Sequence, residues 1–311
     1  MKAWSFCSNA FSKPVQIDET LAKTRRGAAI LAVPQRPVCR YCIAGCHNGQ
    51  HGDHFMPDEQ RLAATNDGSD DASGTLAVYV WRGDKNGGGE QRFDVPRQES
   101  QTVLDVVTWV QQQADASLTY RFACRVGMCG SCAMMVNDEP RWTCRTHIGR
   151  VARNGELHIA PLRNLPVIKD LVTDMDSFFD KWVKAEAIHH PSAGRSDEFA
   201  SVTPDDPARI EASAGIECIN CAICYAACDT VAGNPDYLGP AALQRAWTLY
   251  NDSRDDGGDA ILDAVSQSGG CHSCHSMGSC SHYCPNDLDP MGAIAGLKRA
   301  TAKRFFGGGR S

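Results

Sequence analysis

The sequence CINCAICYAAC at residues 218–228 places four cysteines at a close, regular spacing. The spacing returns in CHSCHSMGSCSHYCP at residues 271–285, where it falls on three cysteines and on Met277. One of eight expected thiols is therefore replaced by a thioether. Closely spaced thiolates of this kind are typical ligands of iron–sulfur clusters. We expect the C-terminal half of the chain to fold so that the two stretches enclose such clusters together.

The spacing is the ligand frame of bacterial-type ferredoxins, in which the last cysteine of each run binds the cluster of the other run. On this pattern a [4Fe-4S] cluster has four ligands: Cys218, Cys221, Cys224 and Cys284. The second cluster has three: Cys228, Cys274 and Cys280. Because a thioether binds iron far more weakly than a thiolate, the corner at Met277 is expected to lose its iron and leave [3Fe-4S]. Cys271 lies outside the frame and is interpreted as a buried free thiol, with a ligand role at the missing corner as the alternative.

Another cysteine pattern precedes these runs in CRVGMCGSC at residues 124–132, which Cys144 follows after eleven further residues. The first three cysteines match the plant-type ferredoxin frame. They predict a [2Fe-2S] cluster held by Cys124, Cys129, Cys132 and Cys144. Gly127 and Gly130 would let the backbone fold closely round the cluster and aim N–H groups at its sulfurs. Zinc is the alternative occupant.

A third group of cysteines lies near the N-terminus, in CRYCIAGC at residues 39–46. Its three thiols can hold one metal centre: Cys39, Cys42 and Cys46. The string resembles the cluster-binding string near the start of molybdopterin oxidoreductases, which favours a fourth iron–sulfur cluster. Zinc, attached haem and reduced thiols are the alternatives. The fourth ligand would be one of three histidines or none: His47, His51 and His54.

Composition narrows the class of protein. The sixteen cysteines among 311 residues are too few for a disulfide scaffold of this size, and their close spacing indicates metal in a reducing compartment. A net charge of −6 gives no support for nucleic-acid binding. The sequence shows no membrane-spanning apolar run and no export signal, so we expect a cytoplasmic protein that reaches a membrane only through a partner.

Hydrophobic patterning predicts an α+β protein with three regions. Residues 1–74 are interpreted as an N-terminal extension, 75–165 as a plant-type ferredoxin (β-grasp) domain, and 166–311 as an all-helical domain resembling bacterial ferredoxins. Strands are predicted at 75–81, 90–95, 118–122, 133–136 and 156–159. Helices are predicted at 102–113, 168–186, 240–250, 259–267 and 290–304, the first capped by Ser100 or Thr102.

Five motifs follow one another in an order that resembles one family. They are CRVGMCGSC, CINCAICYAAC, NPDYLGPAAL at 234–243, NDSRD at 251–255, and CHSCHSMGSCSHYCP. In this order and spacing they resemble the iron–sulfur subunit of succinate dehydrogenase and fumarate reductase complexes, over residues 75–303. The resemblance implies an oxidoreductase subunit that relays single electrons and performs no substrate chemistry of its own.

The same resemblance implies partners. A flavoprotein subunit would hold FAD and the dicarboxylate, and a membrane anchor or cytochrome b subunit would bind quinone. The chain would then be peripheral, on the cytoplasmic face of the inner membrane, and would serve the tricarboxylic acid cycle. His275, beside Cys274, would relay a proton or contact quinone, with a structural hydrogen bond as the alternative.

Some residues depart from the family pattern. Asp229 stands where the family usually has Pro, and Ala232 and Gly233 replace a Trp that often precedes the Asn-Pro pair. These departures and the N-terminal extension leave open a related flavoenzyme complex that oxidises another substrate or uses an acceptor other than quinone. A zinc-stabilised interaction protein without redox function is the alternative from a different class.

Overall fold

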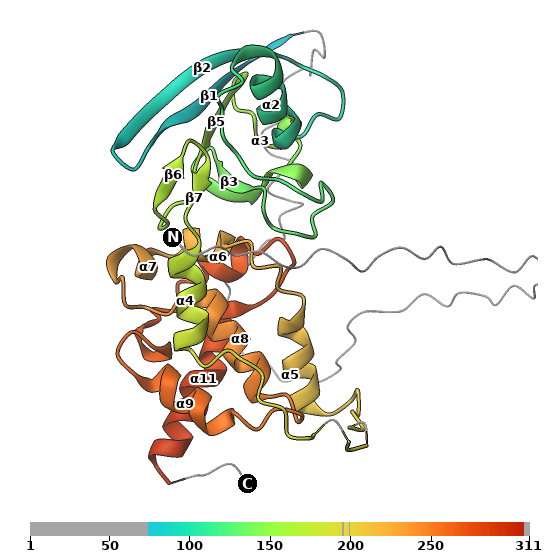
Figure 1. The fold of residues 1–311 in the computed structure, drawn as a ribbon, viewed down its shortest axis with the longest axis vertical. Helices are drawn as coiled ribbons and strands as arrows, with labels where there is room; N and C mark the ends of the chain where they lie inside the picture. The colour runs from blue at the N-terminus through green and yellow to red at the C-terminus, as the bar shows by residue number, and fades with distance from the viewer. Residues whose placement is uncertain (1–73, 195, 199, 308–311) are drawn as a thin grey trace, which may run out of the picture. The chain divides into compact units, whose positions relative to one another are not determined.

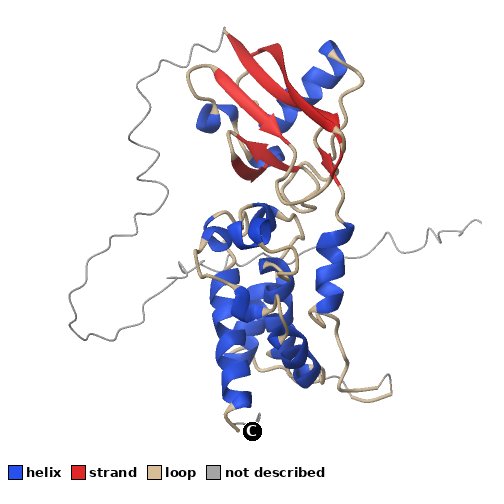
Figure 2. Cartoon of the chain, turned by 90° about the vertical axis from the view of Figure 1, so that its left-hand side faces the viewer, coloured by secondary structure: helices blue, strands red, loops and turns tan. Residues whose placement is uncertain are grey.

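A computed structural model of the chain describes residues 74–194, 196–198 and 200–307. The strands come first in this part of the chain and most of the helices follow. Figure 2 shows the strands gathered in one region and the longer helices in another. The mixed sheet followed by helices agrees with the α+β prediction.

The sheet is built on a long hairpin. Strand β1 (Thr75–Asp84) pairs antiparallel along its whole length with β2 (Gly87–Pro96), as the sequence predicts (Figure 1). Strand β1 also runs parallel to β5 (Glu156–Ala160), so the sheet is mixed. Beyond β5 lie β3 (Ala133–Val136) and β4 (Glu139–Trp142), which form a second antiparallel pair. The β4 strand was missed because its four residues include a proline, which weakens a strand signal.

A helix packs across the sheet. Helix α2 (Val103–Trp109) continues as a π-helical turn at Val110–Ala114. Thr102 caps it: the Asp105 N–H donates to Thr102 Oγ1 at 3.2 Å, and the Thr102 N–H donates to the Asp105 carboxylate at 3.0 Å. One face of the helix is buried against alternate residues of β1 in a single core: Val103, Val106, Val107 and Val110 against Leu76, Val78 and Val80. The predicted helix and its cap at Thr102 are confirmed.

The predicted strand at 118–122 is wrong. Its backbone groups are paired outside any ladder: the Thr119 N–H donates to Asp170 Oδ2 at 2.9 Å, and the Thr119 carbonyl accepts from the Leu171 N–H at 3.1 Å. The buried Asp170 carboxylate also accepts from Arg82 Nε at 3.0 Å. Leu118 is still buried in the sheet core, so the apolar pattern reported burial correctly but not strand pairing.

The predicted helix at 168–186 begins too early. Residues Val167–Lys169 (β6) and Val172–Thr173 (β7) form a small hairpin that joins the sheet, and Asp170 between them has a left-handed φ of 49°. Helix α4 runs only from Asp176–Lys184. Ile168, which the helical pattern included as an apolar position, is half exposed on β6.

The following region is helical. Residues 217–307, all of which the structure describes, contain no strand. Helix α8 (Pro240–Tyr250) lies at its centre, with eight of its eleven residues buried, and its contacts include four of the longer helices. These are α4, α5 (Pro207–Ile216), α9 (Gly258–Ser266) and α11 (Pro290–Phe305). The predicted helices at 240–250, 259–267 and 290–304 are therefore confirmed to within a residue at each end.

The short elements that carry the cysteines lie between these helices. They are α6 (Ile223–Ala226), α7 (Asp229–Gly233), a 3-10 turn at Cys271–Ser273 and α10 (Ser279–His282). In the sheet region the corresponding connection from β4 to β5 contains a 3-10 turn at Thr143–Arg145 and helix α3 (Ile148–Val151). Among the described residues, no helix combines the length and the apolar character that crossing a membrane requires.

Asp252 in the loop after α8 gives a stability prediction. Hydrogen bonds from the Arg254 guanidinium at 2.6 and 2.8 Å hold the pKa of this nearly buried carboxyl at about 2. A depressed pKa stabilises the fold at pH values above the unfolded pKa of about 4 and ceases to do so as pH falls through about 2. Because Arg254 is partly exposed, we expect Asp252→Asn to cost about 1–2 kcal/mol, constant between pH 5 and 8. Thermal melts at one scan rate measure this loss of stability, and Asp263→Asn, at an exposed carboxylate, is the control. An equal decrease of the melting temperature in the two variants would contradict the role assigned to Asp252.

Candidate metal centres

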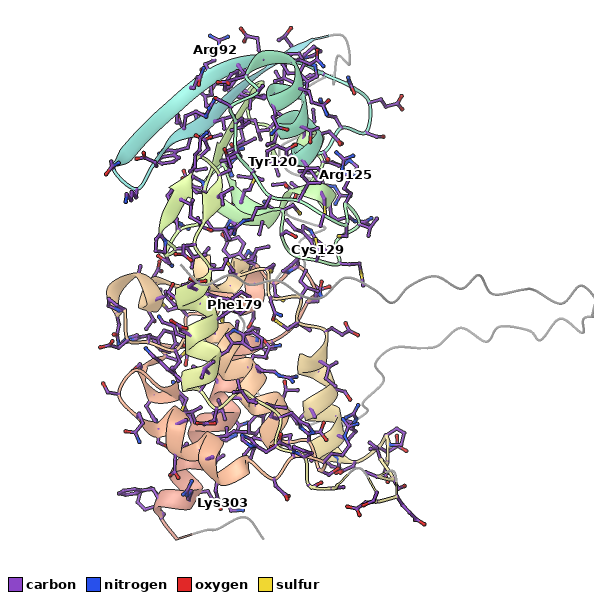
Figure 3. All side chains as sticks on the ribbon, in the orientation of Figure 1. Arg92, Tyr120, Arg125, Cys129, Phe179 and Lys303 are labelled. Carbon is purple, nitrogen blue, oxygen red and sulfur yellow. The ribbon has the colours of Figure 1, made fainter. Side chains whose placement is uncertain are left out.

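The loop between α2 and β3 wraps round the sulfur of Cys124. Backbone N–H groups of Val126, Met128 and Cys129 donate to Cys124 Sγ at 3.4, 3.2 and 3.3 Å. Three residues of the loop have a left-handed φ that turns these groups inward: Arg125, Gly127 and Gly130. Figure 3 labels Cys129 at the tip of this loop. The left-handed glycines thus allow backbone N–H groups of the loop to point at the Cys124 sulfur.

The structure brings the other predicted ligands of this loop to the same place. Cys132 and Cys144 are buried side by side. Burial is the largest cause that raises the pKa of Cys144 to about 12, and the neighbouring Cys132 thiol is the next. The charge of Cys124 also raises the pKa of Cys144. Cys129 lies beside Cys124, since the Cys124 N–H donates to Cys129 Sγ at 3.5 Å. All four thiols therefore converge, although they come from a loop and from a turn after β4.

A second set of thiols is shared between the two cysteine runs. A small apolar cavity is lined by Cys218, Cys221, Cys224 and Cys284. Burial, followed by the charges of the other thiols including Cys284, raises the pKa of Cys224 well above its usual value. Burial, and then the charges of Cys218 and Cys284, raise the pKa of Cys221 to about 12. Four thiols that oppose one another's ionisation in an apolar cavity suit a cationic iron centre, which stabilises thiolates.

The third set joins the remaining cysteines of the two runs. Burial raises the pKa of Cys280 to about 11, and the charges of Cys228 and Cys274 add to this effect. Burial, and then the charges of the same three sulfurs, raise the pKa of the Tyr237 hydroxyl. The Tyr237 ring is fully buried beside them. The Tyr237 hydroxyl is buried and has no hydrogen-bond partner among the described residues. An unpaired buried donor beside three thiols is what a sulfur-rich cluster would satisfy.

The backbone repeats around Met277. In the first run, Asn220 and Ala222 flank Cys221 with φ of 57° and 61°; in the second, Ser276 and Gly278 flank Met277 with φ of 57° and 81°. A short helix follows in each case, α6 and α10, and carries Cys224 or Cys280 at its second residue. Met277 therefore occupies the backbone position of a ligand, but its side chain is 65% exposed.

Cys271 lies away from the three sets. Its side chain is fully buried, and its Sγ lies 4.0 Å from the Thr301 hydroxyl on α11. Burial raises its pKa, while Thr301 and Lys298 act in the opposite direction. Its surroundings are those of a packed free thiol.

His275 lies on the surface beside the third set. It lines an open hollow of about 400 Å³ together with residues of the second run and of α7: Ser273, Met277, Asp229, Thr230, Gly233 and Asn234. Asp229, which departs from the family pattern, is thus part of the same hollow. The structure places His275 beside the third set of thiols without pairing it with another side chain among the described residues.

Other predicted ligands are not described. Cys39, Cys42 and Cys46, with His47, His51 and His54, lie outside the described residues. Within the described ranges, no group of three His, Cys, Asp or Glu side chains is close enough to hold a single metal ion.

The sheet region and the helical region contact each other at the first two sets. A side chain at Gly130, in the first loop, would collide with the backbone of Cys221 and with the Ile219 carbonyl. Glycine at position 130, with φ of 69°, therefore allows the first cysteine loop to lie directly against the second set. The sequence indicated glycines for cluster wrapping, but this packing role depends on a segment ninety residues away and had no local signal.

Comparisons with known proteins agree with this arrangement. Residues 75–180 match the family model described as a 2Fe-2S iron-sulfur cluster binding domain, and residues 217–289 match a 4Fe-4S dicluster domain. The fold and these matches define the chain as an iron–sulfur protein of two ferredoxin-type regions.

Relatives identify the family. The chain is 36% identical over 215 residues to the fumarate reductase iron-sulfur subunit of Mycobacterium tuberculosis, covering 68% of this chain and 85% of that protein. It is 36% identical to the mitochondrial succinate dehydrogenase iron-sulfur subunit 1 of Oryza sativa, covering 63% and 70%. A chain of the Mycobacterium smegmatis Sdh1 complex shares its fold, with a TM-score of 0.67, 24% identity and coverage of 75% and 98%. The chain belongs to the family of fumarate reductase and succinate dehydrogenase iron–sulfur subunits, and it is an electron-transfer subunit of an oxidoreductase.

Proposed function

We propose that the chain holds three clusters in series and relays single electrons between a flavoprotein subunit and quinone at a membrane anchor. The observation that carries the proposal is the convergence of eleven thiols into three sets, two of which draw on both cysteine runs. When bound, iron–sulfur clusters accept and release one electron at a time. The family supports FAD and a dicarboxylate in the flavoprotein partner.

Each set suits one cluster type. We propose Cys124, Cys129, Cys132 and Cys144 for [2Fe-2S], and Cys218, Cys221, Cys224 and Cys284 for [4Fe-4S]. Cys228, Cys274 and Cys280 remain for [3Fe-4S] because Met277 stands at the fourth ligand position. The protein's part is to hold the thiolates, to donate N–H groups to sulfur, and to exclude water from the buried sets.

The order of the sets supports a direction through the chain. The first loop lies against the second set at Gly130, and the second and third sets share the two cysteine runs. The third set adjoins the open hollow at His275, which we propose as the side facing quinone. In this arrangement His275 contacts quinone or relays its proton, and the chain is peripheral at the cytoplasmic face of the inner membrane.

The proposed division of the chain follows from the same arrangement. The [2Fe-2S] region, of plant-type ferredoxin (β-grasp) type, would include β6 and β7, because both strands belong to its sheet. The helical region would begin with α4. We propose that Cys39, Cys42 and Cys46 hold a further cluster or zinc, with one of the nearby histidines as the fourth ligand.

Metal analysis with EPR on the full chain, purified without oxygen, tests the proposal. We expect about nine irons per chain (two, four and three) and an oxidised three-iron signal. Twelve or more irons would place a fourth cluster at the N-terminal cysteines. A folded, colourless chain without iron, or one that contains only zinc, would overturn the proposal.

A hydroxyl in the first loop should tune the first centre. Ser131 Oγ lies 3.0 Å from Cys129 Sγ; although burial opposes it, the Ser131 hydrogen bonds and those from Cys124 lower the pKa of Cys129 to about 6. A donor to a ligand sulfur stabilises the more negative, reduced cluster. We expect Ser131→Ala to lower the midpoint potential of the [2Fe-2S] centre by about 50 mV.

A redox titration of the reduced [2Fe-2S] EPR signal measures this shift. Ser177→Ala, at an exposed position of α4, is the matched control and should leave the potential unchanged. An unchanged potential in Ser131→Ala would show that the hydroxyl does not donate to the ligand.

A further inference from the structure

Lys181 on α4 is buried without a carboxylate partner. The residue is 7% exposed, and its ammonium donates to the Tyr225 hydroxyl at 2.8 Å and to the Tyr237 carbonyl at 2.7 Å. The ammonium also lies 5.0 Å from the centre of the Tyr225 ring. In the part of the chain that the structure describes, no carboxylate forms a salt bridge with Lys181. Its contacts are neutral oxygens and an aromatic ring.

An unpaired buried cation is costly and requires a nearby negative charge. Burial, and then Lys184, lower the pKa of Lys181, whereas Asp236 and Cys228 raise it. Asp236 is exposed, so solvent screens its effect. Cys228 belongs to the third set, and three thiolates round a cluster would supply the missing negative charge on the buried side.

Tyr237 connects Lys181 to the same set of sulfurs. Its carbonyl accepts from Lys181, and its fully buried hydroxyl lacks a partner. The hydroxyl is buried beside Cys274 and Cys228, and a tyrosine hydroxyl is an available donor at neutral pH. The loop 234–243 thus presents one backbone acceptor to the cation and one side-chain donor to the thiols.

We propose that Lys181 and Tyr237 are positioning residues that raise the affinity of the third centre for an electron. The proposal rests on the three-thiolate centre of the proposed function. One electron arrives from the preceding centre, no bond forms or breaks, and Lys181 keeps its proton. The reduced state carries one more negative charge, so a fixed cation and a hydroxyl donor both stabilise it more than the oxidised state. The third centre then becomes the favourable exit for electrons.

The two residues can be tested separately. Lys181→Met removes the charge and keeps the apolar stem. Tyr237→Phe removes only the hydroxyl, because the bond from Lys181 goes to the backbone carbonyl of residue 237. Lys184→Met removes a lysine charge from the exposed side of the same helix and is the matched control, and Tyr79→Phe on β1 is the control for the loss of a hydroxyl.

The measurement is a redox titration of the three-iron EPR signal in the full chain. We expect Lys181→Met to reduce the equilibrium constant for reduction about tenfold, equivalent to 59 mV for one electron. Tyr237→Phe should reduce it about threefold to tenfold. Lys181→Arg should restore most of the constant. Both control variants should change it less than about twofold.

The outcomes separate this inference from the proposed function. A normal three-iron signal with unchanged potentials in Lys181→Met and Tyr237→Phe would overturn the inference and leave the relay intact. Absence of the three-iron signal in the unmodified chain would overturn the proposed function. If Lys181→Met does not accumulate, Tyr237→Phe decides the inference, because it deletes a single oxygen and keeps the backbone carbonyl that accepts from Lys181.

Discussion

Met277→Cys is expected to convert the third centre from three irons to four. The backbone at 276–278 has the same left-handed, ligand, left-handed sequence of conformations as the backbone at Cys221, so a thiol at position 277 would enter the cage without rearrangement of the chain. A fourth thiolate would retain the corner iron that a thioether does not hold. Iron content should rise from about nine to about ten per chain, and the oxidised three-iron EPR signal should disappear.

Two variants control this experiment. Met277→Leu keeps an apolar side chain at the position and should retain the three-iron signal. Cys271→Ser removes the cysteine of the second run that lies outside the ligand frame and packs against Thr301, and it should also leave the signal unchanged. Loss of the signal in Cys271→Ser, or its persistence in Met277→Cys, would contradict the assignment of the corner.

Exchanging single ligands should reveal that the two runs cross. Cys284 belongs to the second run in sequence but lines the cavity of the first. Cys228 belongs to the first run, but its charge raises the pKa of Cys280 in the second run. We therefore expect Cys284→Ser to abolish the four-iron centre and lower the iron content by about four per chain. Cys228→Ser should abolish the three-iron centre and lower the iron content by about three per chain.

Mössbauer spectra of iron-57-enriched protein, together with EPR of oxidised and reduced samples, distinguish the centres. The [2Fe-2S] signal serves as the internal control, since its ligands lie in another region of the chain. If Cys284→Ser removed the three-iron signal and spared the four-iron centre, each run would bind its own cluster and the crossed arrangement would be wrong. If both centres vanished in each variant, Cys→Ala variants at the same positions would show whether the serine oxygen disturbs the neighbouring cage.

Local patterns in the sequence were sufficient for much of this fold. The helix at 240–250 was predicted to the residue because Pro240 begins it and its apolar positions follow a helical period. Thr102 was foreseen as a cap because a threonine precedes the buried valines, and Asp105 completes the box. The cysteine spacing predicts eleven ligands in three sets, and the structure brings the thiols of each set near one another, while their role as cluster ligands stays a prediction.

Other features depended on contacts between distant segments. Residues 118–122 have the composition of a strand, but the buried carboxylate of Asp170 takes the place of a neighbouring strand. The apolar residues near 168 follow a helical period but belong to a hairpin that adds to the sheet. Lys181 gave no signal in the sequence, because a lysine on an amphipathic helix is ordinarily exposed and only the fold shows that it is buried.

The interleaving of the two cysteine runs also bears on how the chain is made. Cys284 lies sixty residues after Cys224, so a ribosome adding 5–20 residues per second needs about 3–12 s to synthesise the interval. During that time three thiols of the cavity are present and the fourth is not. Metal delivery to this half of the nascent protein must therefore wait until the second run has emerged, and a scaffold or chaperone that shields the early thiols would prevent their oxidation in the meantime.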